Sequence, residues 1–112
     1  MNISIITFTE NGTKLAEKIR QAFVNTKTEE AKNLGLSLSD WTRQQFAEKN
    51  AIVVIGACGI AVRMIAPFVS DKLSDSPVVV ADEAGTFVIP LLSGHVGGAN
   101  ELAEQIAGQI GG

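Results

Sequence analysis

Short apolar runs alternate along the chain with segments in which apolar residues recur at helical spacing. The runs at residues 3–8, 51–55 and 78–81 are apolar and β-branched at consecutive positions, which is typical of strands covered on both faces. Residues 15–23 place apolar side chains at i, i+4, i+7 and i+8, which predicts one face of a helix. A strand, a short turn and a helix at the amino terminus indicate an α/β domain.

The remaining segments predict two amphipathic helices, one nearly wholly apolar helix and a hairpin. We expect Ser39 to cap a helix over residues 40–49 that turns Trp41 and Phe46 inward. The apolar helix is expected over residues 60–68, limited by a proline at its last turn, and the last helix over residues 99–110.

Two further segments complete the predicted sheet. Residues 86–90 are predicted to return antiparallel to the strand at 78–81 after a tight turn. Residues 24–33 are polar and are interpreted as a surface segment, whereas the alternating leucines at 34–38 suggest a short strand.

The fold class predicted from this pattern is α/β, with three α/β/α layers. The mixed, mostly parallel sheet is expected to have four to five strands, including one antiparallel hairpin. Residues 1–112 are expected to form a single α/β domain. Because the chain stops where an α/β protein usually enters another strand, we expect it to be a fragment; a complete small domain is the alternative.

Composition excludes several classes of function. The 112 residues are 46% hydrophobic and carry nine Lys and Arg against twelve Asp and Glu, a net charge of −3. The apolar fraction argues against disorder, and the lack of a basic surplus argues against nucleic-acid binding. With one Cys and one His we predict no metal site. Neither a signal peptide nor an apolar run of about 18 residues is present, so we predict no membrane contact and a cytoplasmic location.

The first candidate site is the glycine-rich turn at residues 56–59. Gly56 and Gly59 let a ligand approach the main chain, and the N–H groups at the start of a helix favour an anion. Arg63 is the only charged residue between Gly56 and Ser70. It is expected either to bind a ligand or to form a salt bridge, with Asp71, Asp75 and Asp82 as the candidate partners. Cys58 is more simply a packing residue than a nucleophile.

The second candidate site is the turn at residues 93–101, which holds the only histidine. Histidine is the side-chain type whose unperturbed pKa suits proton transfer near neutrality, so His95 is a candidate acid or base. The main-chain N–H groups of Gly97 and Gly98 are candidates for binding an oxyanion. Asn100 and Glu101 are interpreted first as helix-capping residues. Asp82 and its neighbour Glu83 are interpreted first as a solvated turn.

No complete nucleotide-binding or serine-hydrolase motif is present, but a family resemblance is. The strings GIAVR at 59–63, IAP at 65–67, VVADE at 79–83 and LLSGHVGGAN at 91–100 resemble the amino-terminal region of the cobalamin-biosynthesis protein G (CbiG) family. The resemblance covers about residues 55–106, and the run at 91–100 is its most specific part.

The resemblance implies an activity that composition does not. Members of this family are cobalt-precorrin-5A hydrolases, which open the ring-A δ-lactone and release acetaldehyde to give cobalt-precorrin-5B in anaerobic cobalamin biosynthesis. The implied partner is a cobalt-bearing tetrapyrrole with a fringe of carboxylates. No separate cofactor is expected, because cobalt arrives with the substrate. A carboxyl-terminal domain of the same protein is expected beyond this chain, and a homo-oligomer is compatible with the sequence.

On this basis the candidate residues receive roles. His95 is expected to activate water or move the lactone proton, with Asp82 or Glu101 assisting. Arg63 is expected to anchor a peripheral carboxylate. The two turns are expected to lie side by side at one edge of the sheet, and their residues form the substrate-binding set Gly56, Gly59, Ser93, Gly94, Gly97, Gly98 and Asn100.

Two alternatives remain open at this point. One is a non-catalytic tetrapyrrole-binding or architectural domain of the same enzyme. The other is a nucleotide- or phosphate-binding regulatory module, against which the absence of a complete phosphate-binding motif counts.

Overall fold

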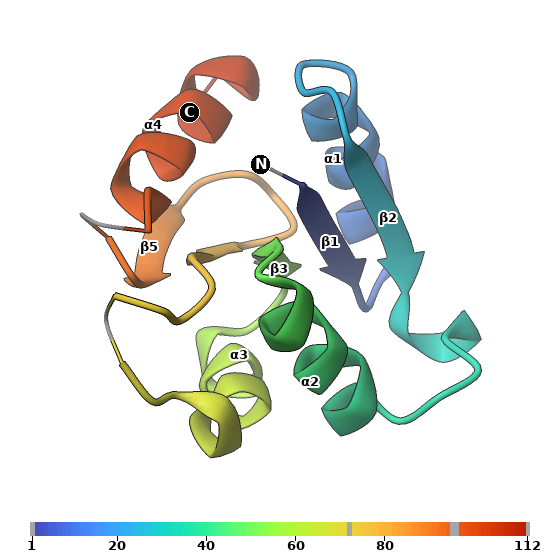
Figure 1. Ribbon diagram of the computed structural model, residues 1–112. Coiled ribbons are helices and arrows are strands. Elements are labelled where there is room, and N and C mark those ends of the chain that lie inside the picture. The colour runs from blue at the N-terminus through green and yellow to red at the C-terminus, as the bar shows by residue number, and fades with distance from the viewer. Residues whose placement is uncertain (1, 72, 95–96, 112) are drawn as a thin grey trace.

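The computed structural model describes residues 2–71, 73–94 and 97–111 and contains one five-stranded sheet flanked by helices (Figure 1). The strands are β1 (Ile3–Thr7), β2 (Thr26–Glu30), β3 (Ala51–Ile55), β4 (Val78–Ala81) and β5 (Val88–Leu92). The helices are α1 (Glu10–Arg20), α2 (Leu38–Glu48), α3 (Cys58–Ile65) and α4 (Ala99–Gln109), with short 3-10 turns at Ala31–Asn33 and Ala66–Phe68. None of the helices in the described part of the chain is both long and apolar enough to cross a membrane.

The sheet has the strand order β2-β1-β3-β4-β5. β1 pairs in parallel with β2 and β3, and β3 pairs in parallel with β4. β5 is antiparallel to β4, with a register shift between Val78 and Val79. The predicted mixed sheet with one antiparallel hairpin is therefore confirmed, although β5 begins and ends two residues later than predicted.

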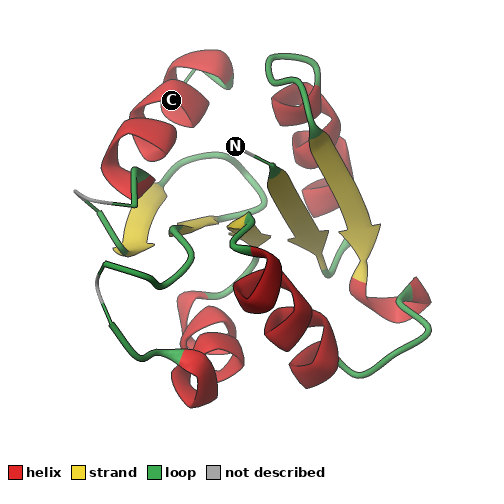
Figure 2. Ribbon diagram, viewed as in Figure 1, coloured by secondary structure: helices red, strands yellow, loops and turns green. Residues whose placement is uncertain are grey.

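The three central strands are buried on both faces because helices cover both sides of the sheet (Figure 2). On one face, side chains such as Ile5 and Val53 pack with α1 and α4. On the other, Ile52 and Val54 pack with residues of α2 and α3, including Trp41. These two apolar layers confirm the predicted three-layer architecture and explain why the strands are apolar at consecutive positions.

Three sequence-based assignments are wrong. The polar segment that includes Thr26–Glu30 is not a surface excursion but the edge strand β2. An edge strand is half-exposed, so it tolerates polar and charged side chains that hide its pattern. The leucines at 34–38 do not form a strand, because Ser37 caps α2 by accepting a hydrogen bond from the Asp40 amide at 3.0 Å. The helix therefore begins two residues earlier than a cap at Ser39 would allow.

Candidate functional site

The first glycine-rich turn lies at the edge of the sheet where the parallel strands end. In an open α/β sheet, ligand sites form at this carboxyl edge, where the strand order reverses, here between β1 and β3.

The turn between β1 and α1 lies at the same edge. It is built by Thr9, whose Oγ1 accepts the Gly12 amide at 2.9 Å and donates to the carboxylate of Glu83. This contact joins the β1–α1 turn to the β4–β5 turn, 74 residues apart. No local pattern in the sequence predicts it.

The glycines of this first turn differ in what they contact. The Gly56 amide donates to the Ala81 carbonyl at 2.9 Å, and a Cβ at Gly56 would lie 3.2 Å from the Phe8 ring. A Cβ at Gly59 would meet nothing within 4 Å. Close packing therefore favours glycine at 56, whereas packing gives no reason for glycine at 59.

Asp82 belongs to the β4–β5 turn at the same edge. Its Oδ1 accepts the Phe87 amide at 2.7 Å, and its carbonyl accepts the Gly85 amide at 3.0 Å. The side chain thus closes the hairpin turn, which agrees with the interpretation of Asp82 as a turn residue.

Arg63 lies on the outer side of α3, in a shallow groove between α2 and α3. The groove has a volume of about 340 Å³ and is lined by Leu38, Ser39, Ile60, Arg63 and Met64. Among the described residues, no ion pair joins Arg63 to an aspartate. Since α2 and α3 both begin at the carboxyl edge, the Leu38–Ser39 end of the groove lies near the first turn. The guanidinium thus has an apolar groove beside it and no described acidic partner.

The second glycine-rich turn lies at the opposite edge of the sheet. It follows β5, and Leu92 at the end of β5 pairs with Val78 at the beginning of β4. The Ser93 hydroxyl donates to the Asp75 carbonyl at 3.1 Å, just before β4. The Asp75 carboxylate in turn accepts the amides of Ser70 and Asp71 at 2.9–3.1 Å. The turn is therefore fixed to the loop that enters the sheet.

This placement overturns the expectation that the two turns share one edge. Gly56 contacts Ala81 at the end of β4, whereas the second turn begins beside Val78 at its start. Three residue steps along a strand separate the two points by about 10 Å. The physical reason is the antiparallel direction of β5, which delivers the next turn to the amino edge. His95 itself lies outside the described residues, but Gly94 and Gly97 on either side of it are at that edge.

Glycine at 94 and 97 has a packing reason within the turn itself. A Cβ at Gly97 would lie 2.5 Å from the Ser93 Cβ, and a Cβ at Gly94 would lie 2.6 Å from the Asn100 side-chain oxygen. Gly98 has a φ of 89°, in the left-handed region that favours glycine. The glycine richness that suggested ligand contact is thus also what allows the turn to fold back on itself.

The turn supplies carbonyl groups to the start of α4. The Ala99 amide donates to the Ser93 carbonyl at 3.1 Å, and the Asn100 amide donates to the Gly94 carbonyl at 3.0 Å. Gly98, the N-cap residue, provides no side-chain cap and accepts the Leu102 amide at 3.0 Å through its carbonyl. Two amides at this helix start are therefore engaged by the chain itself and not by a ligand.

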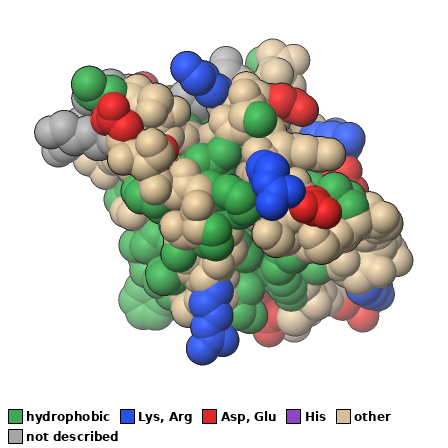
Figure 3. Space-filling view, turned by 60° about the horizontal axis from the view of Figure 1, so that its bottom comes forward, with side chains coloured by type: hydrophobic (Ala, Val, Ile, Leu, Met, Phe, Trp, Pro, Cys, Tyr) green, Lys and Arg blue, Asp and Glu red, His purple; other side chains and the backbone are tan. Residues whose placement is uncertain are grey.

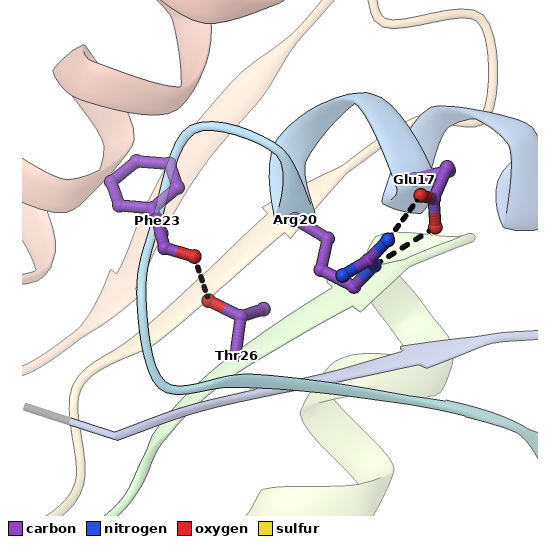
Figure 4. Close-up of polar contacts among 4 residues, drawn as sticks. All are labelled: Glu17, Arg20, Phe23 and Thr26. Carbon is purple, nitrogen blue, oxygen red and sulfur yellow. Dashed lines mark hydrogen bonds and ion pairs between the residues drawn. The ribbon is translucent and has the colours of Figure 1, made fainter.

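A recess of about 360 Å³ adjoins the second turn. It is lined by Ile3, Ala22, Phe23, Val24, Gly98, Glu101, Leu102 and Gln105. Figure 4 shows its α1 side, where the Phe23 ring points toward α4 and the Thr26 hydroxyl donates to the Phe23 carbonyl at 3.3 Å. Glu101 is exposed at the α4 side. Of the two acids proposed to assist His95, only Glu101 is on the same edge as the turn.

An exposed ion pair stands near this recess. Arg20 bonds Glu17 through both Nε and Nη2 (Figure 4). The hydrogen bond from Arg20 lowers the pKa of Glu17, and the same bond raises the pKa of Arg20. Both side chains are in solvent, so the pair has little influence on the recess.

A buried polar cluster on the α2 side of the sheet was not anticipated. The Gln45 side-chain oxygen accepts hydrogen bonds from the Ser4 hydroxyl at 2.6 Å and from the Asn50 side-chain nitrogen Nδ2 at 2.8 Å. All three side chains are buried. They lie beside a polar recess of about 310 Å³ whose lining also includes Lys27 and Glu29 of β2. Within the described part of the chain, no three His, Cys, Asp or Glu side chains are placed to share a metal ion.

The fold and these turns define a class of protein. The chain is a doubly wound α/β domain with strand order 2-1-3-4-5, a class in which ligands bind in the crevice beyond the carboxyl ends of the strands. Here the antiparallel β5 moves the histidine-bearing turn away from the usual carboxyl edge. Comparison of the chain with known proteins then identifies its family within this class.

The model of the Cobalamin synthesis G N-terminal family matches residues 40–112, well over half of the chain. The cobalt-precorrin-5A hydrolase of Salmonella typhimurium is 41% identical over 98% of this chain, which covers 33% of that protein. That of Priestia megaterium is 46% identical over 58% of the chain and 17% of its own length. The chain belongs to the Cobalamin synthesis G N-terminal family.

A solved structure agrees with this assignment. A cobalamin biosynthesis protein G homolog from Sulfolobus solfataricus superposes with a TM-score of 0.76 at 25% identity, over 98% of this chain and 34% of that one. The CbiG resemblance inferred from the sequence is therefore confirmed. The chain spans about a third of the length of the Salmonella and Sulfolobus proteins that it matches over nearly its whole length.

Proposed function

We propose that residues 1–112 are the amino-terminal third of a cytoplasmic cobalt-precorrin-5A hydrolase, which opens the ring-A δ-lactone of its substrate and releases acetaldehyde. The observation that carries this proposal is the 41% identity to the Salmonella hydrolase over 98% of the chain. The match to the family model over residues 40–112 supports it, because that range includes the histidine-bearing turn. The cobalt belongs to the substrate and enters the site with it.

We assign proton transfer to His95 in the second turn. Hydrolysis of a lactone requires a base that takes a proton from the attacking water and an acid that returns one to the leaving oxygen. Gly97 and Gly98 precede α4, so their main-chain amides are the nearest candidates to stabilise the oxyanion. Ser93, Gly94 and Asn100 hold the turn in shape through the contacts to α4 and to Asp75. We assign the assisting role to Glu101.

The candidate residues at the carboxyl edge are proposed to contact the substrate separately from His95. Arg63, with Gly56 in the turn before α3 and Gly59 in the first turn of that helix, binds a peripheral carboxylate of the substrate at the carboxyl edge. We assign no proton-transfer role to Asp82. Its Oδ1 accepts the Phe87 amide, and it lies at the carboxyl edge of the sheet, opposite the edge that holds Gly97. Positioning of a large substrate by such remote contacts contributes to rate through orientation.

The test is His95→Ala in a full-length hydrolase, made by replacing the matched third of the Salmonella protein with residues 1–112. We expect the turnover number for acetaldehyde release from cobalt-precorrin-5A to fall about 10²- to 10⁴-fold, the usual range for loss of an acid–base group. Glu104→Gln, a change on the exposed side of α4, is the matched control and retains the parent rate.

A parent rate in His95→Ala would remove the catalytic role. If, in addition, the parent full-length protein binds the substrate and Arg63→Ala weakens that binding, the two results together would support the alternative in which this domain only holds the tetrapyrrole.

A further inference from the structure

The start of β5 is exposed on one side of the sheet. On the α1–α4 side, α4 packs on β5, and Val88 packs with the core of that side. On the α2–α3 side, α2 and α3 pack against each other and α3 lies over β4. At the end of β5, Leu91 and Leu92 pack with the core of that side, whereas Phe87 and Ile89 at the start of the strand are exposed. Within β5, residues 89 and 91 point there, because successive strand side chains alternate between faces, and Phe87 directly precedes the strand.

The side chains at this place are apolar and exposed. Phe87 is 65% exposed and Ile89 is 42% exposed. Val62 on α3 is 46% exposed, and Cys58 stands one helical turn before it. Ile60, Arg63 and Met64 line the α2 side of α3, so Cys58 and Val62 are on its other flank, toward β5. We call Cys58, Val62, Phe87 and Ile89 the α3–β5 surface.

Figure 3 brings the α2–α3 side of the molecule forward. Hydrophobic side chains gather over a large part of this face, with only a few cationic and acidic side chains among them. The α3–β5 surface contains no charged residue. Exposed apolar side chains gathered on one face are normally covered by another protein surface, and their chemistry does not suit the carboxylate fringe of a tetrapyrrole.

We propose that the α3–β5 surface is the docking surface for the remaining two thirds of the full-length hydrolase. The chain covers only 33% of the Salmonella relative and 34% of the Sulfolobus structure. A polypeptide twice as long as this domain therefore accompanies it in those proteins. Interfaces between domains of one chain bury part of their apolar surface, and the α3–β5 surface holds exposed apolar side chains at an edge strand of the sheet. The inference depends on the proposed function only in that the domain works within a longer hydrolase.

The test uses Cys58 as a built-in reporter, because it is exposed in the domain. N-ethylmaleimide labelling of the Cys58 peptide is followed by mass spectrometry in residues 1–112 alone and in the full-length protein that carries them. We expect labelling to be at least tenfold slower in the full-length protein. This readout does not require catalysis, so it succeeds or fails independently of the proposed activity.

Two substitutions in the full-length protein locate the effect. Ile89→Asp is expected to return Cys58 labelling to within twofold of the free domain. Val24→Asp changes an apolar side chain that is 83% exposed on a different part of the molecule, and it leaves the protection intact. Circular dichroism of each variant in the free domain checks folding. Phe87→Ser replaces Ile89→Asp if the latter fails to fold, since most of the Phe87 side chain is already in solvent.

Three results would overturn the proposal. Equal labelling rates in the free domain and the full-length protein would show that nothing covers the surface. Loss of protection in Val24→Asp as well as Ile89→Asp would show that the protection is not local. Labelling of the free domain that slows as its concentration rises would assign the surface to a second copy of this chain.

Discussion

Individual glycines in this domain serve different purposes. Gly97 has no room for a Cβ, because Ser93 occupies the space at 2.5–2.8 Å. Gly108, within α4, has nothing within 4 Å of the same position. Counting glycines in a sequence does not separate these cases, whereas the distance to the nearest atom does. For Gly97, the constraint is how closely the turn folds on itself.

We predict opposite effects for two substitutions that look alike. Gly97→Ala lowers the free energy of unfolding by about 1–3 kcal/mol, the usual range for forcing extra volume into a packed site. Gly108→Ala raises it by up to about 1 kcal/mol, because alanine favours the helix. Urea denaturation of both variants measures the difference. Equal values would mean that the Ser93–Gly97 contact does not constrain the turn in solution.

At the scale of elements, hydrogen bonds decide where helices begin. α2 begins at Leu38 because Ser37 accepts the Asp40 amide, although Ser39 is an equally good capping residue by type. α4 begins after a left-handed glycine and receives carbonyls from the preceding turn in place of a side-chain cap. The direction of β5 has the largest consequence, since it determines the edge of the sheet at which the histidine-bearing turn lies.

The start of α2 supplies a direct comparison. Ser37→Ala is expected to cost about 0.5–2 kcal/mol of stability, the usual loss for a capping hydroxyl. Ser39→Ala is expected to change stability by less than about 0.5 kcal/mol, as is common for an exposed position without such a contact. Thermal or urea unfolding of the two variants distinguishes them, and a larger loss for Ser39→Ala would place the cap where the sequence alone suggested it.

At the scale of the whole molecule, the sheet keeps two loop regions apart. Thr9, Gly56, Asp82 and Glu83 gather at the carboxyl edge, and the turn from Ser93 gathers at the amino edge with Asp75. A substrate therefore either extends around the domain and meets both regions or contacts only one of them. This separation is the reason for treating Arg63 and His95 as independent contacts.

The separation has a thermodynamic consequence. Gly56→Ala crowds Phe8 at one edge, and Gly97→Ala crowds Ser93 at the other. Because the sites share no neighbours, their effects on the free energy of unfolding are expected to add to within about 0.5 kcal/mol in the double variant. A coupling clearly above 1 kcal/mol in a double-mutant cycle would contradict the placement of the turns on opposite edges.

The sequence by itself determined the features that depend on near neighbours along the chain. Three buried strands, the helices and the antiparallel return of β5 follow from spacing and residue type, and the run at 91–100 was specific enough to indicate the family. The sequence pattern did not predict β2, because an edge strand needs no alternation of apolar and polar residues.

Only the tertiary structure decided which turns meet. Thr9 bonds Glu83, and Ser4 and Asn50 bond Gln45, across separations that no periodicity encodes. The direction of β5 was predictable, and with the strand pairing it placed the second turn at the amino edge. Local patterns reflect the contacts of one element with its surroundings, whereas proximity between elements is set by the order and direction of strands in the sheet.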